Sequence, residues 1–284
     1  MRTALLIILY SLELAAAAQV GESLGHDGAG PALKHRVEAL ASATTDAARD
    51  SLNELLKSDL RAVLESDSAF TFAFAEVPLS VLTPPDARFR LVTWNVPRTD
   101  GSHRYEGLLV LQEPRRRVLF ELRDMTERIT HPALVELGPD NWYGALYYQV
   151  IPVRKGGKTY YTLLGWKGHS AIETRKVIEV LSFRGAVPRF GAPLFGEGRV
   201  KQQRVVFAYS FQASMSLNWD EAGARIVCDH LSPMRPDLEG QPAFYGPDLS
   251  YDAYVWDKDR WLFQRDVDAR DLRRDIRPWN APPK

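Results

Sequence analysis

The clearest indication of the fold class is the segment Tyr143–Trp166, which reads YGALYYQVIPVRKGGKTYYTLLGW. Aromatic and β-branched residues, which favour strands, fill 143–153 and again 159–166. Between them, Lys155-Gly156-Gly157-Lys158 is a turn signal, because adjacent glycines readily adopt the positive φ angles of a two-residue hairpin loop. The stretch therefore predicts two antiparallel strands joined by a tight turn.

The same rhythm continues on both sides of this hairpin. Turn signals such as 99–102 and 220–223 recur at a spacing of roughly 8–14 residues, as in all-β proteins. The expected strands are 89–95, 105–112, 117–122, 176–183, 205–218, 224–230 and 254–266, with another at the alternating Phe70, Phe72 and Phe74. We therefore expect a mainly β fold, an antiparallel meander arranged as a sandwich, an open barrel or a propeller-like array.

A helical pattern precedes the strands, between residues 33 and 65. Apolar side chains recur there at spacings of three and four: Leu52, Leu55, Leu56, Leu60, Val63 and Leu64. This stripe predicts a helix that packs on the sheet. Ser51 followed by Glu54 is typical of a capping box at its start. Because 39–48 is rich in alanine, it predicts a first, looser helix.

The beginning of the chain predicts export. Arg2 precedes an apolar stretch at 5–14, and Ala15–Ala18 offers a small-residue cleavage site, so we expect residues 1–18 to be a signal peptide. The polar, glycine-rich segment 19–32 is expected to be a flexible leader, and 33–284 a single β-rich domain. No later segment is long and apolar enough to span a bilayer, which predicts a periplasmic or secreted protein.

Composition argues against several classes of function. Lys plus Arg and Asp plus Glu each number 36, so the formal net charge is zero, whereas nucleic-acid binding needs a concentrated basic face. The single cysteine, Cys228, permits no internal disulfide. The histidines outside the candidate sites below are scattered without zinc-ligand spacing: His26, His35, His103 and His131. We expect no metal, no cofactor and no nucleic acid.

Two short motifs place a nucleophile beside a histidine. Gly168-His169-Ser170-Ala171-Ile172 follows a strand as a nucleophile elbow does, but Ile172 stands where the turn needs a small residue, so a polar hairpin loop is the alternative. Cys228-Asp229-His230 ends a strand and puts Cys228 and His230 on one face. A Cys–His nucleophilic pair competes there with a buried, inert cysteine. His230 also adjoins a loop, where functional residues concentrate.

The densest polar and aromatic segment is 245–254. Tyrosines such as Tyr245 and Tyr251 combine an apolar face with a polar tip, which suits a carbohydrate or peptide groove. Asp248 and Asp252 offer the hard oxygens that Ca²⁺ prefers, although the spacing matches no EF-hand loop. The alternative is an Asx turn that fixes a loop to the sheet.

Four segments resemble parts of exported bacterial β-rich proteins that carry no assigned function. They are Tyr160–Trp166, Lys176–Leu181, Asp229–Leu231 and Tyr245–Asp248, and they cover roughly the C-terminal half. The resemblance implies export and a β-rich fold. It implies no catalytic residue and no cofactor.

These candidates leave three functions open. The first is an exported, non-catalytic protein of the bacterial cell envelope that binds a small-molecule, carbohydrate or protein ligand. Its candidate ligand-binding residues are His169, Asp229, His230, Tyr245, Asp248, Tyr251 and Asp252. The second is a hydrolase acting on carbohydrate or peptide, which requires two carboxylates across one cleft and a proton carrier. Its candidates are Glu179, Asp229, Asp248, Asp252 and Asp266, with His169 or His230 as the carrier. The third is a structural component of the envelope.

Overall fold

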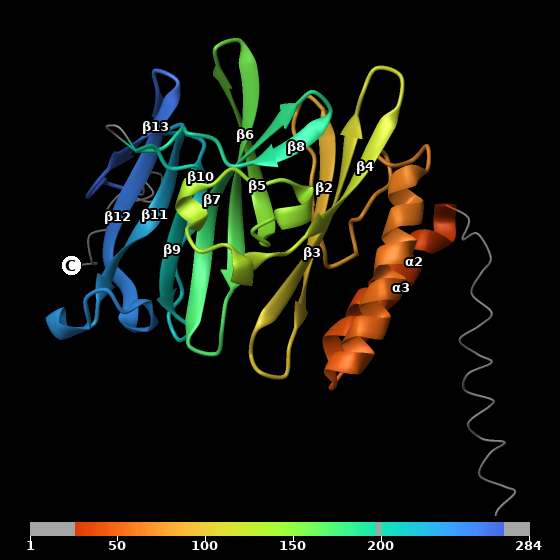
Figure 1. Cartoon of the computed structure of the whole chain (residues 1–284), viewed down its shortest axis with the longest axis horizontal. Coiled ribbons are helices and arrows are strands. Elements are labelled where there is room, and N and C mark those ends of the chain that lie inside the picture. Colours follow the sequence, from red (N-terminus) through yellow and green to blue (C-terminus); the bar gives the residue numbers. More distant parts are fainter. Residues whose placement is uncertain (1–25, 197–199, 270–284) are drawn as a thin grey trace, which may run out of the picture.

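The computed structural model describes residues 26–196 and 200–269. Two helices precede a series of antiparallel strands that form three sheets. Figure 1 shows the sheets following one another from the helices at one end to the C-terminal strands at the other. The expected fold class, a mainly β antiparallel meander with N-terminal helices, is confirmed in a sandwich-like form. No helix of the described residues combines the length and apolar character needed to cross a bilayer.

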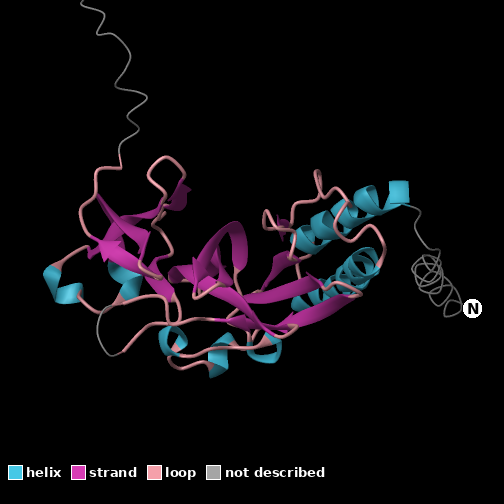
Figure 2. Ribbon diagram, turned by 90° about the horizontal axis from the view of Figure 1, so that it is seen from above, coloured by secondary structure: helices cyan, strands magenta, loops and turns pink. Residues whose placement is uncertain are grey.

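The helices are α2 (His26–Ser42) and α3 (Asp46–Glu65), which lie side by side at one end of the molecule (Figure 2). The start of α2 falls inside segment 19–32, where the sequence predicts a flexible leader. Gly30 and Pro31 disfavour a helix, but Ala29 and Leu33 are buried, and tertiary packing overrides a weak local propensity.

The start of α3 also differs from the prediction. Thr45 is the N-cap and its hydroxyl accepts a hydrogen bond from the Ala48 N–H, so the predicted capping box at Ser51 is wrong. Ser51 instead lies one turn inside the helix, where its hydroxyl donates to the carbonyl of Ala47.

The first sheet has the order β1 (Ser80–Leu82), β2 (Phe89–Pro97), β3 (His103–Gln112), β4 (Arg117–Arg123). One face packs against the helices, where Leu56, Leu60 and Leu64 of α3 meet Val92 and Leu108. The predicted strand at Phe70–Phe74 is wrong. Phe70 lies in a turn and residues 72–74 have no regular secondary structure, while Phe72 and Phe74 are buried in the same cluster.

The second sheet contains β5 (Leu146–Lys155), β6 (Lys158–Gly168), β7 (Glu173–Arg184) and β8 (Val187–Phe190), with β9 (Val205–Ser210) also paired to β7. The hairpin predicted from Tyr143–Trp166 is β5–β6. Lys155 pairs with Lys158, and φ is 54° at Gly156 and 75° at Gly157, the positive values that a tight turn requires.

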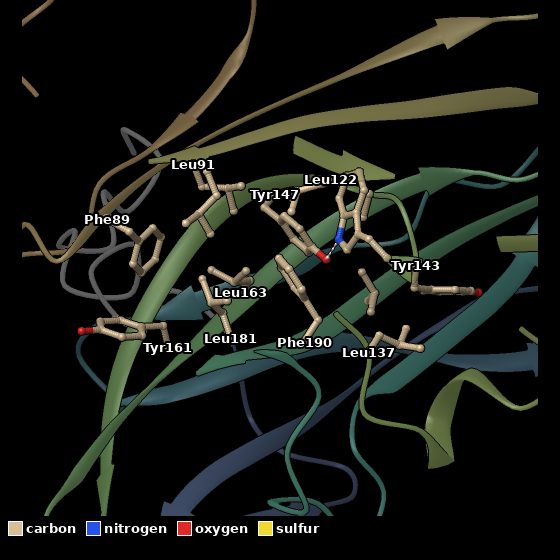
Figure 3. Close-up of a cluster of buried hydrophobic side chains, with 14 of the residues drawn as sticks. Phe89, Leu91, Leu122, Leu137, Tyr143, Tyr147, Tyr161, Leu163, Leu181 and Phe190 are labelled. Atoms are coloured by element: carbon tan, nitrogen blue, oxygen red, sulfur yellow. Dashed lines mark hydrogen bonds between the residues drawn. The ribbon is translucent and has the colours of Figure 1, made fainter. Parts of the chain in front are cut away.

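A shared core joins the first and second sheets (Figure 3). Leu91 of β2 and Leu163 of β6 lie in it, whereas their neighbours Val92 and Leu164 belong to the clusters on the opposite faces. Strands buried on both sides have continuous apolar runs rather than strict alternation. Each fully buried leucine contributes about 1.5–3 kcal/mol of hydrophobic stabilisation.

The third sheet has the order β10 (Leu217–Asp220), β11 (Arg225–Pro233), β12 (Tyr245–Asp257), β13 (Arg260–Gln264). Here two predicted strands are each divided by a turn. Segment 205–218 becomes β9 and β10, and 254–266 becomes the end of β12 and β13. Lys258 and Asp259 make the second turn with positive φ angles, 45° and 70°, which the sequence does not signal because neither residue is glycine.

Candidate functional site

Six of the seven predicted ligand-binding residues, all except His169, lie on the β11–β12 hairpin. Asp252 is buried, with Oδ2 2.7 Å from Nδ1 of His230, and its Oδ1 accepts a hydrogen bond from the Asp266 N–H at 3.1 Å. Asp248 accepts from the N–H and hydroxyl of Ser250 and from the hydroxyl of Ser232, and these bonds lower its pKa to about 2. The predicted Asx turn at Asp248 is thereby confirmed.

The remaining residues of that segment hold the backbone in place. The Tyr245 hydroxyl accepts from the Gly240 N–H at 3.0 Å, and the carbonyl of Tyr251 accepts from the Val267 N–H at 2.8 Å. Asp229 accepts from the Ser216 N–H at 2.7 Å. Their polar atoms therefore stabilise loops around the hairpin. Burial raises the pKa of the Cys228 thiol to about 12, so this cysteine is protonated at neutral pH.

His169 lies elsewhere, in the loop between β6 and β7. The adjacent Ser170 hydroxyl accepts hydrogen bonds from the N–H groups of Ile172 and Glu173, which confirms the polar-loop interpretation of this motif. His169 lines a cavity of about 330 Å³. None of the other six predicted site residues is among the described residues lining it.

This cavity lies where three segments far apart in the sequence meet. They are the β2–β3 hairpin with His103, the segment Asp124–Arg128 after β4, and the end of β6 with Lys167 and Gly168. Pairing of β2 with β3 and of β6 with β7 places these strand ends, and the shared core in Figure 3 joins the two sheets behind them.

Lys167 is the most unusual residue of the cavity. Its side chain is almost fully buried, and Nζ donates to Thr126 Oγ1 at 2.8 Å and to the Gly144 carbonyl at 2.7 Å. The rings of Tyr105 and Tyr143 contact the ammonium, with centroids 4.3 and 4.8 Å away. No carboxylate of the described residues lies within 4.0 Å of Nζ. Burial therefore lowers the pKa of Lys167 to about 8.

A hydrogen-bonded chain connects Lys167 to the nearest carboxylate. Asp124 Oδ1 accepts from the Thr126 N–H at 3.0 Å and from its hydroxyl at 2.5 Å, so that hydroxyl donates to Asp124 and accepts from Lys167. Asp124 Oδ2 accepts from the Tyr105 N–H at 3.0 Å. The chain fixes the amine without giving it a direct counter-ion.

Two glycines make this packing possible. A Cβ on Gly144, where φ is +26°, would lie 2.6 Å from the Asp124 carboxyl carbon and 2.7 Å from Tyr105. A Cβ on Gly168 would lie 2.7 Å from the His103 ring and equally close to Trp166. Each distance is shorter than carbon–carbon contacts allow, so any side chain at these positions would displace residues of the cavity.

Two imidazoles share the cavity with Lys167. Burial, reinforced by the positive charge of Lys167, lowers the pKa of His103. His169 also has a lowered pKa, caused first by burial and then by the Arg175 guanidinium. A lowered pKa favours the neutral imidazole, which is able to accept a proton.

The remaining charges of the wall are mainly basic. Arg98, Arg104 and Arg128 line the cavity with Asp124 and Glu127. Asp50 Oδ1 lies 2.8 Å from Arg98 and 2.9 Å from Arg104, and Glu106 lies 3.0 Å from Arg104, so both guanidinium groups already have carboxylate partners.

An adjoining cavity of about 380 Å³ provides an internal comparison, because it contains a lysine with counter-ions. Lys57 Nζ lies 3.0 Å from Glu106, 3.1 Å from Glu121 and 3.5 Å from Glu54. Burial opposes the charge of Lys57, but its bonds to Glu106 and Glu121 outweigh burial and raise its pKa. Lys167 has no such partners, which marks its cavity as the stronger candidate.

Comparison with known proteins does not add a family. No protein-family model matches this chain, and no curated protein or solved structure matches it significantly. The candidate site therefore depends on its own geometry.

Most of this site is missing from the sequence-based candidates. Only His169 was among them, whereas Lys167, His103, Asp124 and Thr126 were not. The sequence contains one indication of its burial. Lys167 follows Leu163 and Gly165 at a spacing of two, so it lies on the face of β6 that packs in the core shared with the first sheet.

One carboxylate of the hydrolase hypothesis has a structural role instead. Glu179 is fully buried, and its Oε2 accepts from Arg204 Nε at 2.7 Å. Among the described residues, no group of three or more His, Cys, Asp or Glu side chains has a metal-binding arrangement.

Proposed function

We propose that this is an exported, non-catalytic protein that binds a small carboxylate in the cavity lined by Lys167, His103 and His169. The observation that carries the proposal is the buried amine of Lys167, a residue that lines the cavity and has no carboxylate partner among the described residues. A buried charge is strongly disfavoured unless it is paired, and a bound carboxylate would supply the missing partner.

The charge balance supports a monoanion. Arg98 pairs with Asp50, and Arg104 pairs with Asp50 and Glu106, which leaves these two guanidinium groups little capacity to neutralise a highly charged ligand. Arg128 lines the same cavity, and within the described residues no carboxylate lies in ion-pair distance of it. One ammonium and one guanidinium match the two oxygens of a carboxylate.

Thermal unfolding in the presence of propionate, pyruvate and phosphate tests the proposal. A ligand at about one hundred times its Kd stabilises the folded state by about 2.7 kcal/mol, which corresponds to a rise in Tm of roughly 5–10 °C for a domain of this size. We expect the carboxylates to produce such a rise in the wild type and phosphate to have a smaller effect.

Two variants make this experiment specific. Lys167→Met removes the amine from the cavity, and its Tm should not respond to carboxylates. Lys176→Met is the matched control, because Lys176 is also half-buried against a tyrosine ring, Tyr148, but does not line the cavity. An equal response in Lys167→Met and the wild type, or an equal response to chloride at the same ionic strength, contradicts the proposal.

Export is a separate part of the proposal, supported by Arg2, the apolar stretch 5–14 and Ala15–Ala18. Expression of the full chain in a Gram-negative host should yield a periplasmic product that begins at Gln19. A cytoplasmic product that retains Met1 would contradict it.

A further inference from the structure

The hydrogen bonds of Lys167 can be made by a neutral amine as well as by an ammonium. A neutral primary amine has two N–H donors and one lone pair, whereas an ammonium has three N–H donors and no lone pair. The two oxygens bound to Nζ, Thr126 Oγ1 and the Gly144 carbonyl, account for two donors. Thr126 Oγ1 donates its own proton to Asp124, so it is an acceptor toward Lys167. In the neutral form, neither partner therefore uses the lone pair.

The surroundings also favour that neutral form. Burial removes the ammonium from water, and Arg175 adds positive charge, which together lower the pKa of Lys167 to about 8 against the opposing effect of Asp124. At pH 7.5 roughly a quarter of such a lysine is neutral, against roughly a thousandth of an ordinary lysine. In its neutral form Lys167 has a lone pair that neither hydrogen-bond partner uses, and the residue lines a cavity, as expected of a nucleophilic lysine.

We propose that Lys167 forms a reversible imine with a small carbonyl compound that carries a carboxylate, such as a 2-oxo acid. This inference rests on the proposed function, because Arg128 in the wall of the cavity is taken to hold the carboxylate while the neutral form of Lys167 reacts with the carbonyl group. It extends that function by assigning a covalent step to one atom, Lys167 Nζ.

The reaction balances without an oxidant or reductant. The lone pair of Nζ forms a bond to the carbonyl carbon, and a proton moves from nitrogen to the former carbonyl oxygen. That oxygen then leaves as water with the second amine hydrogen, and a C=N bond remains. The two neutral imidazoles in the cavity, His103 and His169, are suited to accept and return the protons.

Reductive trapping tests the inference on the full chain. The protein is incubated with pyruvate and cyanoborohydride at pH 7.5, and the modified lysines are identified by peptide mass spectrometry. The larger neutral fraction of Lys167 raises its rate of modification, and its lower basicity offsets part of that increase. We therefore expect Lys167 to be modified at least about tenfold faster than Lys155 and Lys158 of the β5–β6 turn. Because the modified site is read in the wild type, this result does not depend on the folding of a variant.

Variants and ligands then separate this inference from the proposed function. Lys176→Met should retain the rapid modification and Lys167→Met should lose it. If propionate raises Tm but Lys167 is modified no faster than Lys155, carboxylate binding stands and the imine is wrong. If Lys167 is modified rapidly by pyruvate and by uncharged acetone alike, and propionate has no effect on Tm, the amine is reactive but carboxylate recognition fails.

Discussion

Replacing Lys167 with methionine removes the buried amine and should change how stability depends on pH. The pKa of Lys167 is about 8 in the folded protein and about 10.5 in the unfolded chain. Between those values the unfolded state binds more protons, so the free energy of unfolding rises as pH increases. From pH 7.5 to 9.5 this linkage contributes about 2 kcal/mol in the wild type. In Lys167→Met the contribution is absent.

Urea denaturation at intervals of half a pH unit between pH 7.5 and 9.5 measures this difference. The upper limit of pH 9.5 avoids the range in which buried tyrosines dominate the pH dependence of stability. Burial raises the pKa of Tyr161 and Tyr254 well above 10, so at higher pH they ionise only on unfolding, which lowers the free energy of unfolding. Lys176→Met should reduce the change of unfolding free energy with pH by less, because the Lys176 amine is less buried than that of Lys167 and burial lowers its pKa less.

Parallel pH profiles for the wild type and Lys167→Met would show that Lys167 does not have a lowered pKa in the folded protein. Such a result would mean that water or a rearrangement solvates the amine in the folded protein, and the basis for both the carboxylate site and the imine would then disappear. The comparison uses slopes, so it does not depend on whether methionine packs better or worse than lysine at neutral pH.

Three further predictions concern other parts of the molecule. Arg204→Met should destabilise the protein by about 3–5 kcal/mol in urea, because it leaves the buried Glu179 carboxylate without its ion-pair partner and the carbonyls of Pro132 and Val135 without the Arg204 donor; the double variant with Glu179→Leu should be less destabilised than the single variant. Gly168→Ala should cost about 1–3 kcal/mol and shift the His103 imidazole resonances in NMR spectra, because the new methyl group displaces that ring; unchanged resonances would contradict the packing. The Cys228 thiol should react with a disulfide reagent at pH 8 only after unfolding, since burial raises its pKa to about 12, and rapid reaction of the native protein would show that the thiol is accessible.

The sequence predicts the parts of this fold that depend on local chemistry. Gly156 and Gly157 mark the β5–β6 turn because their backbones adopt positive φ without strain. Lys258 and Asp259 adopt the same region without such a signal, so the β12–β13 turn was predicted as continuous strand. The leader 19–32 was expected to be flexible because the burial of Ala29 and Leu33 depends on packing partners that local propensity does not report.

The candidate site is harder to predict for a topological reason. His103, Thr126 and Lys167 belong to a hairpin, a one-turn helix and the end of a strand from another sheet, and only strand order brings them together. Sequence motifs lie within single segments. They therefore point to the β11–β12 residues, where Asp252 and His230 are cross-strand neighbours of one hairpin, and to only His169 of the cavity.

The contrast between Lys57 and Lys167 gives the strongest reason to assign function to one cavity over the other. The two cavities adjoin and share Arg104 and Asp124, so their general electrostatic surroundings are similar. Lys57 nevertheless has carboxylate partners within 3.5 Å, whereas Lys167 has a hydroxyl, a carbonyl and two aromatic rings. A lysine that serves only to stabilise the fold is expected to resemble Lys57, because direct pairing offsets the cost of burial. For Lys167 the cost of burying the charge is not offset by a direct ion pair, and two glycines leave space for the side chains around it. This arrangement is expected of a side chain that pairs with a bound ligand.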